Sequence, residues 1–316
     1  MKSHALPGIF GILFAVCLHA SPAHAILQTF VSGGGDDNNT CTRQFPCRSF
    51  QVAHDHVNAS GGFINCLDVF DSSTNATFNI TKSITIDCSG IFAKVLGPGG
   101  NGTTIVINGA GIVVTLRGLS IEGAGGGGIG IDIQNADTVR VEGCKIFGFP
   151  SSPGVGIKFS PTARTTLLVN DCVISDNRTG ILIDPTATGF ATVNLQRVTM
   201  QRNSSTGLTA TGVGGGPILV SVRNSIASQN GLHGFAAVTL AGDSGVLMSI
   251  EGSEASYNVT SGVLVNGPTS VAISHSTIIG NGTGVNQFNG GTVFSYGNNL
   301  FFVNSADGVP AVASLK

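Results

Sequence analysis

The side chains in this sequence best suited to chemistry are its carboxylates, and five of the seventeen fall opposite a cation when the repeated segments of the chain are aligned. The opposed pairs are Arg117 with Glu142, Asp132 with Lys158, Asp171 with Arg197, Asp176 with Arg202, and Arg223 with Glu251. A neighbouring cation lowers the pKa of a carboxyl group, whereas a general acid must hold its proton near neutral pH. These acids are therefore predicted to be structural partners.

A few acids lie outside the aligned columns, in predicted loops. Asp36 and Asp37 are adjacent in one loop, and Asp137, Asp184 and Asp243 lie in others. Loop acids can converge in space without showing a period, so a calcium site or a catalytic pair built from them stays open. The aligned columns carry no acids on neighbouring segments. We predict no catalytic residue, no metal site and no cofactor.

The histidines and one glycine run are the other candidates. His233 lies in Gly231-Leu232-His233-Gly234 and is predicted to be an exposed turn residue. His54 and His56 are two apart in a predicted helix and do not share a face, so solvated side chains are expected rather than metal ligands. Residues 127–132 match the start of a calcium-binding nonapeptide repeat, but such sites need consecutive copies and the sequence has one.

The N-terminal segment has the pattern of a secretory signal. In residues 1–25, Lys2 precedes an apolar core and Ala23-His24-Ala25 supplies a small-residue cleavage site. The apolar run is too short to span a bilayer, so cleavage is favoured over a membrane anchor. The mature protein is therefore predicted to be secreted or periplasmic, without membrane insertion.

Export places the remaining cysteines in an oxidising compartment, where disulfides persist. Cys41 and Cys47 flank a short loop, and Cys66 and Cys88 end two strand-like segments. We predict disulfides Cys41–Cys47 and Cys66–Cys88. A zinc site formed by these four cysteines is disfavoured because their spacing contains no C-x-x-C pair.

Two further cysteines share one column of the repeat. Cys144 and Cys172 align there with Leu119, Val198, Ser225, Ser253 and Ser276. Neighbours in such a column are close enough for a disulfide. Two buried free thiols are favoured, and whether the pair is bonded stays open.

The elements that must position all these residues are set by a repeat. Successive segments end in an asparagine followed three or four residues later by glycine, with steps of 26, 27, 28, 23 and 23 residues. The asparagines are Asn177, Asn203, Asn230, Asn258, Asn281 and Asn304. A fixed period in this range indicates a solenoid. Stacked coils would bring these side chains into one ladder of amides, and asparagine also suits a left-handed turn conformation.

Within each repeat, apolar and polar residues alternate as in strands. Val139, Val141 and Cys144 follow this pattern, and Val193, Leu195 and Val198 repeat it. Two or three short strands per repeat make one coil of a single-stranded, right-handed parallel β-helix, an all-β fold. About nine coils spaced by about 4.8 Å predict a rod on the order of 45 Å long.

The predicted organisation has three parts: a signal peptide over 1–25, a cap with the first coils over 26–90, and repeats over 91–316. Solenoids expose apolar ends and need caps. A short amphipathic helix from Ser49 to Val57, with Phe50, Ala53 and Val57 on one face, is the expected N-terminal cap.

These features resemble the right-handed parallel β-helix repeat proteins of the pectate-lyase-like superfamily. More narrowly, the opening TFVSG strand, cysteine loop, helix and ITKSITIDC segment resemble small secreted bacterial β-helix proteins of unassigned function. The resemblance covers about 29–310 and implies architecture. Enzymes of that superfamily act on polysaccharides as lyases or hydrolases.

The composition limits the classes of partner that the protein can bind. Charged residues make up 10% of the chain and the net charge is −2, so no basic field is available to attract nucleic acid. Outward positions are rich in Asn, Ser, Thr and Gln, namely Asn170, Asn194, Gln196, Thr199, Ser221 and Ser249. We predict a non-catalytic surface that binds a polysaccharide or another extracellular protein; the alternative is a divergent polysaccharide lyase or glycoside hydrolase.

Overall fold

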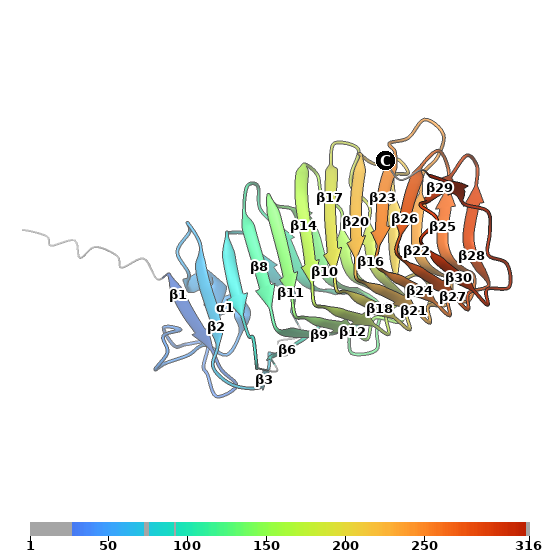
Figure 1. The fold of residues 1–316 in the computed structure, drawn as a ribbon. Coiled ribbons are helices and arrows are strands. Elements are labelled where there is room, and N and C mark those ends of the chain that lie inside the picture. Colours follow the sequence, from blue (N-terminus) through green and yellow to red (C-terminus); the bar gives the residue numbers. More distant parts are fainter. Residues whose placement is uncertain (1–26, 73–75, 92, 314–316) are drawn as a thin grey trace, which may run out of the picture.

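The structure, a computed structural model, describes residues 27–72, 76–91 and 93–313. The predicted signal peptide lies outside these residues. The described chain winds into a single-stranded, right-handed parallel β-helix, in which each coil contributes strands to successive faces of a rod (Figure 1). The predicted fold is confirmed.

The described strands form three parallel sheets of twelve, nine and ten strands. The twelve-stranded sheet consists, in spatial order, of β1 (Gln28–Val31), β2 (Gly62–Cys66), β5 (Ile84–Asp87), β8 (Val113–Arg117), β11 (Thr138–Glu142), β14 (Arg164–Asn170), β17 (Phe190–Gln196), β20 (Ile218–Arg223), β23 (Val246–Glu251), β26 (Ser270–Ser274), β29 (Thr292–Ser295) and β31 (Ala311–Val312). The nine-stranded sheet consists of β4 (Phe78–Ile80), β7 (Thr103–Asn108), β10 (Ile129–Asn135), β13 (Val155–Phe159), β16 (Thr179–Ile183), β19 (Leu208–Thr211), β22 (His233–Val238), β25 (Ser261–Asn266) and β28 (Thr283–Phe288). The ten-stranded sheet consists of β3 (Phe70–Asp71), β6 (Ala93–Leu96), β9 (Leu119–Glu122), β12 (Lys145–Phe147), β15 (Val173–Ser175), β18 (Thr199–Gln201), β21 (Ile226–Ser228), β24 (Glu254–Ser256), β27 (Thr277–Ile279) and β30 (Leu300–Phe302).

Strand alternation decides which side chains enter the core. Along β23, buried and exposed residues alternate strictly, and the predicted inward pairs Val139/Val141 and Val193/Leu195 are buried. Because equivalent residues of neighbouring coils are in register, each inward column stacks like on like and apolar residues fill the axis of the rod. Outward columns stay available to solvent, and they carry the candidate sites.

The asparagine ladder is confirmed. The Asn230 Nδ2 donates to Asn258 Oδ1 at 2.9 Å and to the Met200 carbonyl at 3.2 Å, and the Asn230 backbone N–H donates to the same Asn258 Oδ1 at 3.1 Å. Asn203, Asn258 and Asn281 repeat this arrangement with their own neighbours. Each amide is thus satisfied from two coils, as a buried polar group requires.

The asparagines do not adopt the left-handed conformation that the sequence suggested. That conformation belongs to the residue before each of them: Asp176, Arg202, Gln229, Tyr257, Gly280 and Val303 have φ between 48° and 66°. The preceding residue makes the turn, and the asparagine that follows is thereby directed inward, where its amide meets its neighbours. The prediction that asparagine supplies the turn was wrong.

The glycine after each asparagine is required by close approach between coils. A Cβ on Gly234 would lie 2.7 Å from the Gly262 carbonyl oxygen and 2.9 Å from Asn258 Nδ2. Real Cβ atoms essentially never come within 3.0 Å of backbone, so a larger residue would force the coils apart.

A second ladder runs along the column of Cys144 and Cys172. The Val198 N–H donates to Ser225 Oγ, Ser225 N–H to Ser253 Oγ and Ser253 N–H to Ser276 Oγ, at 3.1 to 3.2 Å. The sequence predicted this column and its burial, which are confirmed, but not its hydrogen bonds. A hydroxyl in this column accepts the backbone N–H of the preceding coil.

The predicted cap is also confirmed. Helix α1 (Phe50–His56) packs across β1, β2 and β4 at the N-terminal end of the sheets (Figure 1). The Ser49 hydroxyl accepts from the Val52 N–H and so caps the first turn. The Phe50 ring lies between Phe70 and Phe78, with centroid distances of 5.6 and 5.9 Å. The helix therefore closes the apolar end of the first coil.

Candidate functional site

A shallow groove crosses the outer face of the twelve-stranded sheet over β17, β20, β23, β26 and β29. Its volume is about 350 Å³. Two outward rows line it, because side chains two residues apart on a strand point to the same face. The upper row contains Thr192, Leu219, Leu247 and Ser270, and the lower row Asn194, Ser221, Ser249, Ala272 and Phe294.

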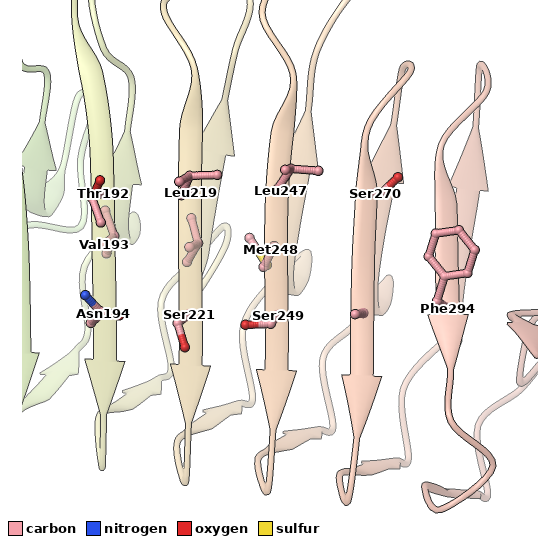
Figure 2. A pocket seen from close by; sticks show the side chains of 12 residues that line it. Thr192, Val193, Asn194, Leu219, Ser221, Leu247, Met248, Ser249, Ser270 and Phe294 are labelled. Carbon is pink, nitrogen blue, oxygen red and sulfur yellow. The ribbon is translucent and has the colours of Figure 1, made fainter. Parts of the chain in front are cut away.

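The two rows combine apolar and polar groups without charge. Leu219 and Leu247 lie side by side on neighbouring strands, with Ser221 and Ser249 below them on the same strands (Figure 2). Phe294 closes the groove at the C-terminal side. Hydroxyl and amide groups here can donate and accept, while the leucines and the ring offer apolar contact. Such a surface suits an uncharged polar ligand that also has apolar faces.

Charged residues border the groove in the next outward row and neutralise one another. Arg223 Nε lies 3.3 Å from Glu251 Oε2. A further hollow of about 390 Å³ continues from Asn194 and Ser221 toward Leu168 and Asn170 on β14. The hollowed part of this face therefore extends from β14 to β29.

Four of the five predicted charge pairs are confirmed as ion pairs, with N–O distances from 2.6 to 3.3 Å. The hydrogen bond from Arg197 lowers the pKa of Asp171, and that from Arg202 lowers the pKa of Asp176. For the fifth, Asp132 is in register with Lys158 as predicted, yet its oxygens accept from Gln134 Nε2 at 2.8 Å and the Ser160 hydroxyl at 3.5 Å.

The sequence missed three ion-pair contacts in the first coils. Lys94 lies between Asp71 and Glu122, 2.8 Å from the latter, and Arg117 lies 3.7 Å from Asp87 as well as contacting Glu142. Asp71, Asp87 and Lys94 precede the first aligned segment, so the alignment that revealed the other pairs did not extend to them. The register of the strands reveals these contacts, which the sequence repeat does not.

The structure separates the loop acids along the rod. Asp137 precedes β11, Asp184 precedes β17 and Asp243 precedes β23, so each lies two coils, or about 10 Å, from the next along the axis. Asp243 accepts from the Gly214 N–H at 3.1 Å. Asp37 accepts from the Arg48 and Ser49 N–H groups and thereby orders the approach to α1. Burial raises the pKa of Asp184, against the opposing effect of Lys158.

A family model described as a right handed beta helix region matches residues 56–221, more than half of the chain. The chain belongs to the right-handed β-helix family. No curated protein matches the sequence. The match includes the asparagine ladder as far as Asn203 and the first half of the groove.

Among solved structures, this β-helix is similar to a pectate lyase, Pel9A, with 16% identity and a TM-score of 0.63 over 89% of this chain and 78% of that one. It is also similar to a rhamnogalacturonan lyase (11% identity, TM-score 0.47, covering 84% and 75%) and to a GH136 lacto-N-biosidase from Eubacterium ramulus (12%, 0.46, covering 91% and 68%). At these identities the likeness shows the fold alone.

The predictions of solvent access were wrong for His54 and His233 and right for His56, which is exposed. His54 is 2% exposed, with Nδ1 2.9 Å from an Asp55 oxygen and Nε2 accepting from the Thr81 N–H at 3.4 Å. His233 begins β22 half-buried, with Nδ1 buried and without a hydrogen-bond partner. Burial lowers the pKa of both. His54 faces the coil beneath the cap, which helical spacing alone does not reveal.

The β-helix contains both predicted disulfides, Cys41–Cys47 and Cys66–Cys88, and Cys144 and Cys172 are buried thiols. Within the described ranges, no three or more His, Cys, Asp or Glu side chains gather in a way that could hold a metal ion. No described helix is both long enough and apolar enough to cross a membrane.

Proposed function

We propose that this β-helix is an exported, non-catalytic protein that binds an extended, uncharged polysaccharide along the outer face of its twelve-stranded sheet. The observation that carries the proposal is the uncharged groove over β17 to β29, where hydroxyl and amide side chains lie beside exposed apolar ones. Successive coils follow one another about every 4.8 Å along the rod. An extended polymer can therefore contact outward side chains on five successive coils.

The lining favours a neutral sugar chain over a charged one. Asn194, Ser221 and Ser249 supply donors and acceptors for sugar hydroxyls, while Leu219 and Leu247 supply contacts for the apolar faces of the rings. Arg223 and Glu251, in the outward row beside the groove, are paired with each other. The pair has no net charge to attract a polyanion, whereas a neutral chain needs none.

Two features support the non-catalytic part of the proposal. Asp171 and Asp176, outward acids on the coil before the groove, are held ionised by arginine, which lowers the pKa of each. The loop acids lie two coils apart along the axis. Two disulfides support an oxidising compartment, and N-terminal sequencing of the exported protein is expected to begin after Ala25.

Binding is tested by affinity electrophoresis and calorimetry against neutral plant and bacterial polysaccharides, with polygalacturonate as the acidic comparison. Replacing both Leu219 and Leu247 by alanine is expected to weaken binding of the neutral chain by about tenfold or more, which corresponds to about 1.4 kcal/mol.

Ile226→Ala is the matched control for this test. Ile226 belongs to the same coil as Leu219 and is similarly exposed (38% against 40%), but it lies on the ten-stranded sheet. Affinity should be unchanged in this variant. Equal losses in the groove variant and the control, or no binding to any neutral polysaccharide tested, would refute the proposal.

A further inference from the structure

Two buried thiols are stacked on neighbouring coils in the middle of the rod. Lys145 of β12 is in register with Val173 of β15, which places the preceding residues, Cys144 and Cys172, one above the other. The Cys144 N–H donates to Cys172 Sγ at 3.4 Å. Both side chains are 1% exposed. The two sulfurs therefore face the same interior column with no side chain between their coils.

The same chain already contains a disulfide with this geometry. Cys66 and Cys88 follow Asn65 and Asp87, which are in register on β2 and β5. They too are stacked on neighbouring coils, with their Cα atoms 4.9 Å apart, and they are bonded. Coil stacking thus brings two cysteines within the Cα separation of roughly 4.4–6.8 Å that a disulfide spans.

We propose that Cys144 and Cys172 form a third disulfide when the chain folds in an oxidising compartment, and that this bond cross-links two neighbouring coils inside the core. The reaction is thiol–disulfide exchange with a protein or small-molecule disulfide. One cysteine thiolate attacks the oxidant and releases one of its thiols. The second thiolate then attacks the mixed disulfide, so the S–S bond forms as the second oxidant thiol leaves; the oxidant is reduced by two electrons.

The position of the pair gives the bond a structural role. Asn177, on the coil of Cys172, is the first asparagine of the ladder, and the coil of Cys144 carries Phe149 in the equivalent place. Phe149 contributes only its backbone N–H, which donates to Asn177 Oδ1 at 3.3 Å. The serine ladder starts later, at Ser225. The proposed bond therefore joins the coils where the laddered part of the rod meets the part without a ladder.

Little is lost when the thiols are oxidised. Cys144 Sγ contacts the carbonyls of Leu116 and Glu142 at 3.6 and 3.4 Å, and Cys172 Sγ those of Val141 and Asn170 at 3.4 and 3.2 Å. A thiol is a weak donor, so giving up these contacts is a minor change. Exchange needs a thiolate, and burial keeps reagents away from the two thiols in the folded protein. The bond should therefore form during folding, before the two coils bury the cysteines.

Tryptic mapping tests the proposal directly. The protein is refolded in a glutathione buffer and in dithiothreitol, alkylated after denaturation, and digested without reduction. Cleavage after Arg140, Lys145, Arg164 and Arg178 isolates the peptides of residues 141–145 and 165–178. We expect these two peptides to be linked in the oxidised sample. Their recovery as alkylated thiols or glutathione adducts, while Cys66 and Cys88 are linked, would overturn the proposal.

A stability measurement separates the third bond from the other two. The control is the double variant C144S/C172S, since Ser225 and Ser253 show that serine fits this column. Full reduction should lower the urea midpoint of the wild type more than that of the variant, because only the wild type loses a third cross-link. Equal decreases would contradict the proposed bond. Peptide mapping stands on its own if the variant does not fold.

Discussion

At the scale of single residues, the rod depends on the hydrogen bonds that a side chain can form with the equivalent residue on the next coil. An asparagine can accept from the N–H of one neighbour and donate to the amide of another, so a column of them satisfies itself. A serine accepts from one coil and donates to a carbonyl of its own coil, as Ser225 does to Arg223 at 2.8 Å. Residue choice in these columns is therefore governed by hydrogen bonding more than by volume.

The Asn230 column gives the prediction at this scale. Replacing Asn230 by alanine should lower the free energy of unfolding by about 1–3 kcal/mol, because the Asn203 amide and the Asn258 oxygen would lose a buried partner. Chemical denaturation measures the change. Asn194→Ala on the exposed face of β17 is the control and should be near neutral. Indistinguishable midpoints for both variants would show that the ladder does not stabilise the rod.

The sequence predicted the asparagine ladder because one residue type recurs at a steady step. It did not predict the left-handed residue before each asparagine, because that place is filled by Asp176, Arg202, Gln229 and Tyr257, which share no side-chain chemistry. The conformation is imposed by the coil and not by the residue. The hydrogen bonds of the serine ladder were not predicted for a related reason. Its column also contains leucine, cysteine and valine, so the sequence indicated only a column of buried side chains.

At the scale of elements, the cap helix is held from beneath as well as by its own apolar face. Lys82 Nζ donates to the carbonyls of His54 and Val57 at 2.9 and 2.8 Å, which satisfies the last turn of α1. The Thr29 hydroxyl donates to the Ala53 carbonyl at 3.2 Å. Sequence periodicity located the helix and its Phe50 face. It could not show that His54 is turned toward the coil, since this depends on tertiary contacts.

Burial of His54 predicts a pH dependence for the cap. Burial lowers its pKa below the ordinary value of 6.5, as Lys82 also does, while Asp55 acts in the opposite direction. The unfolded chain therefore binds the proton more readily than the folded one. The stabilising contribution of neutral His54 is complete above the unfolded pKa and is lost as the pH falls through the lower folded pKa.

The pH test compares His54→Gln with the wild type. Glutamine can still accept from the Thr81 N–H but does not titrate, so the melting temperature of this variant should fall less between about pH 8 and about pH 5. His56→Gln, an exposed change on the same helix, should behave like the wild type. Identical pH profiles for wild type and His54→Gln would exclude the cap as a pH-sensitive element. His233 is present in all three proteins, so its contribution to the pH dependence cancels in the comparison.

At the scale of the whole molecule, one repeat produces both the core and the surface. Because the strands are in register, inward columns are filled by apolar side chains or by hydrogen-bonded ladders. Outward columns are free to carry residues that bind a ligand, so a groove can extend across five strands. The fold was predictable because every coil repeats the inward pattern. The groove was only partly predictable: Asn194, Ser221 and Ser249 were recognised as outward polar residues, whereas Leu219, Leu247 and Phe294 have no common period or type that marks them as one surface.

The arrangement of acids along the rod leads to the last prediction: the mature protein does not cleave polygalacturonate, with or without calcium. Lyase chemistry on a uronic acid needs clustered carboxylates for the metal and a group that takes a proton. Along the outward row from β5 to β11, acids alternate with arginine: Asp87, Arg117, Glu142. Burial raises the pKa of Asp87, but the hydrogen bond from the Ser89 N–H and the nearby charge of Arg117 outweigh it, so that the pKa is lowered. Such an acid is kept ionised by its partners.

Asp184 is the acid that most deserves a direct test, because burial raises its pKa toward the range that proton transfer requires. Its two loop counterparts, Asp137 and Asp243, lie about two coils, or about 10 Å, away along the axis on either side. Release of unsaturated uronides is followed by absorbance with added calcium and with chelator, beside an active pectate lyase. We expect no release above background. Calcium-dependent release that disappears in Asp184→Asn, but persists in the matched variant Asp243→Asn, would instead establish the β-helix as a lyase acting through its loops.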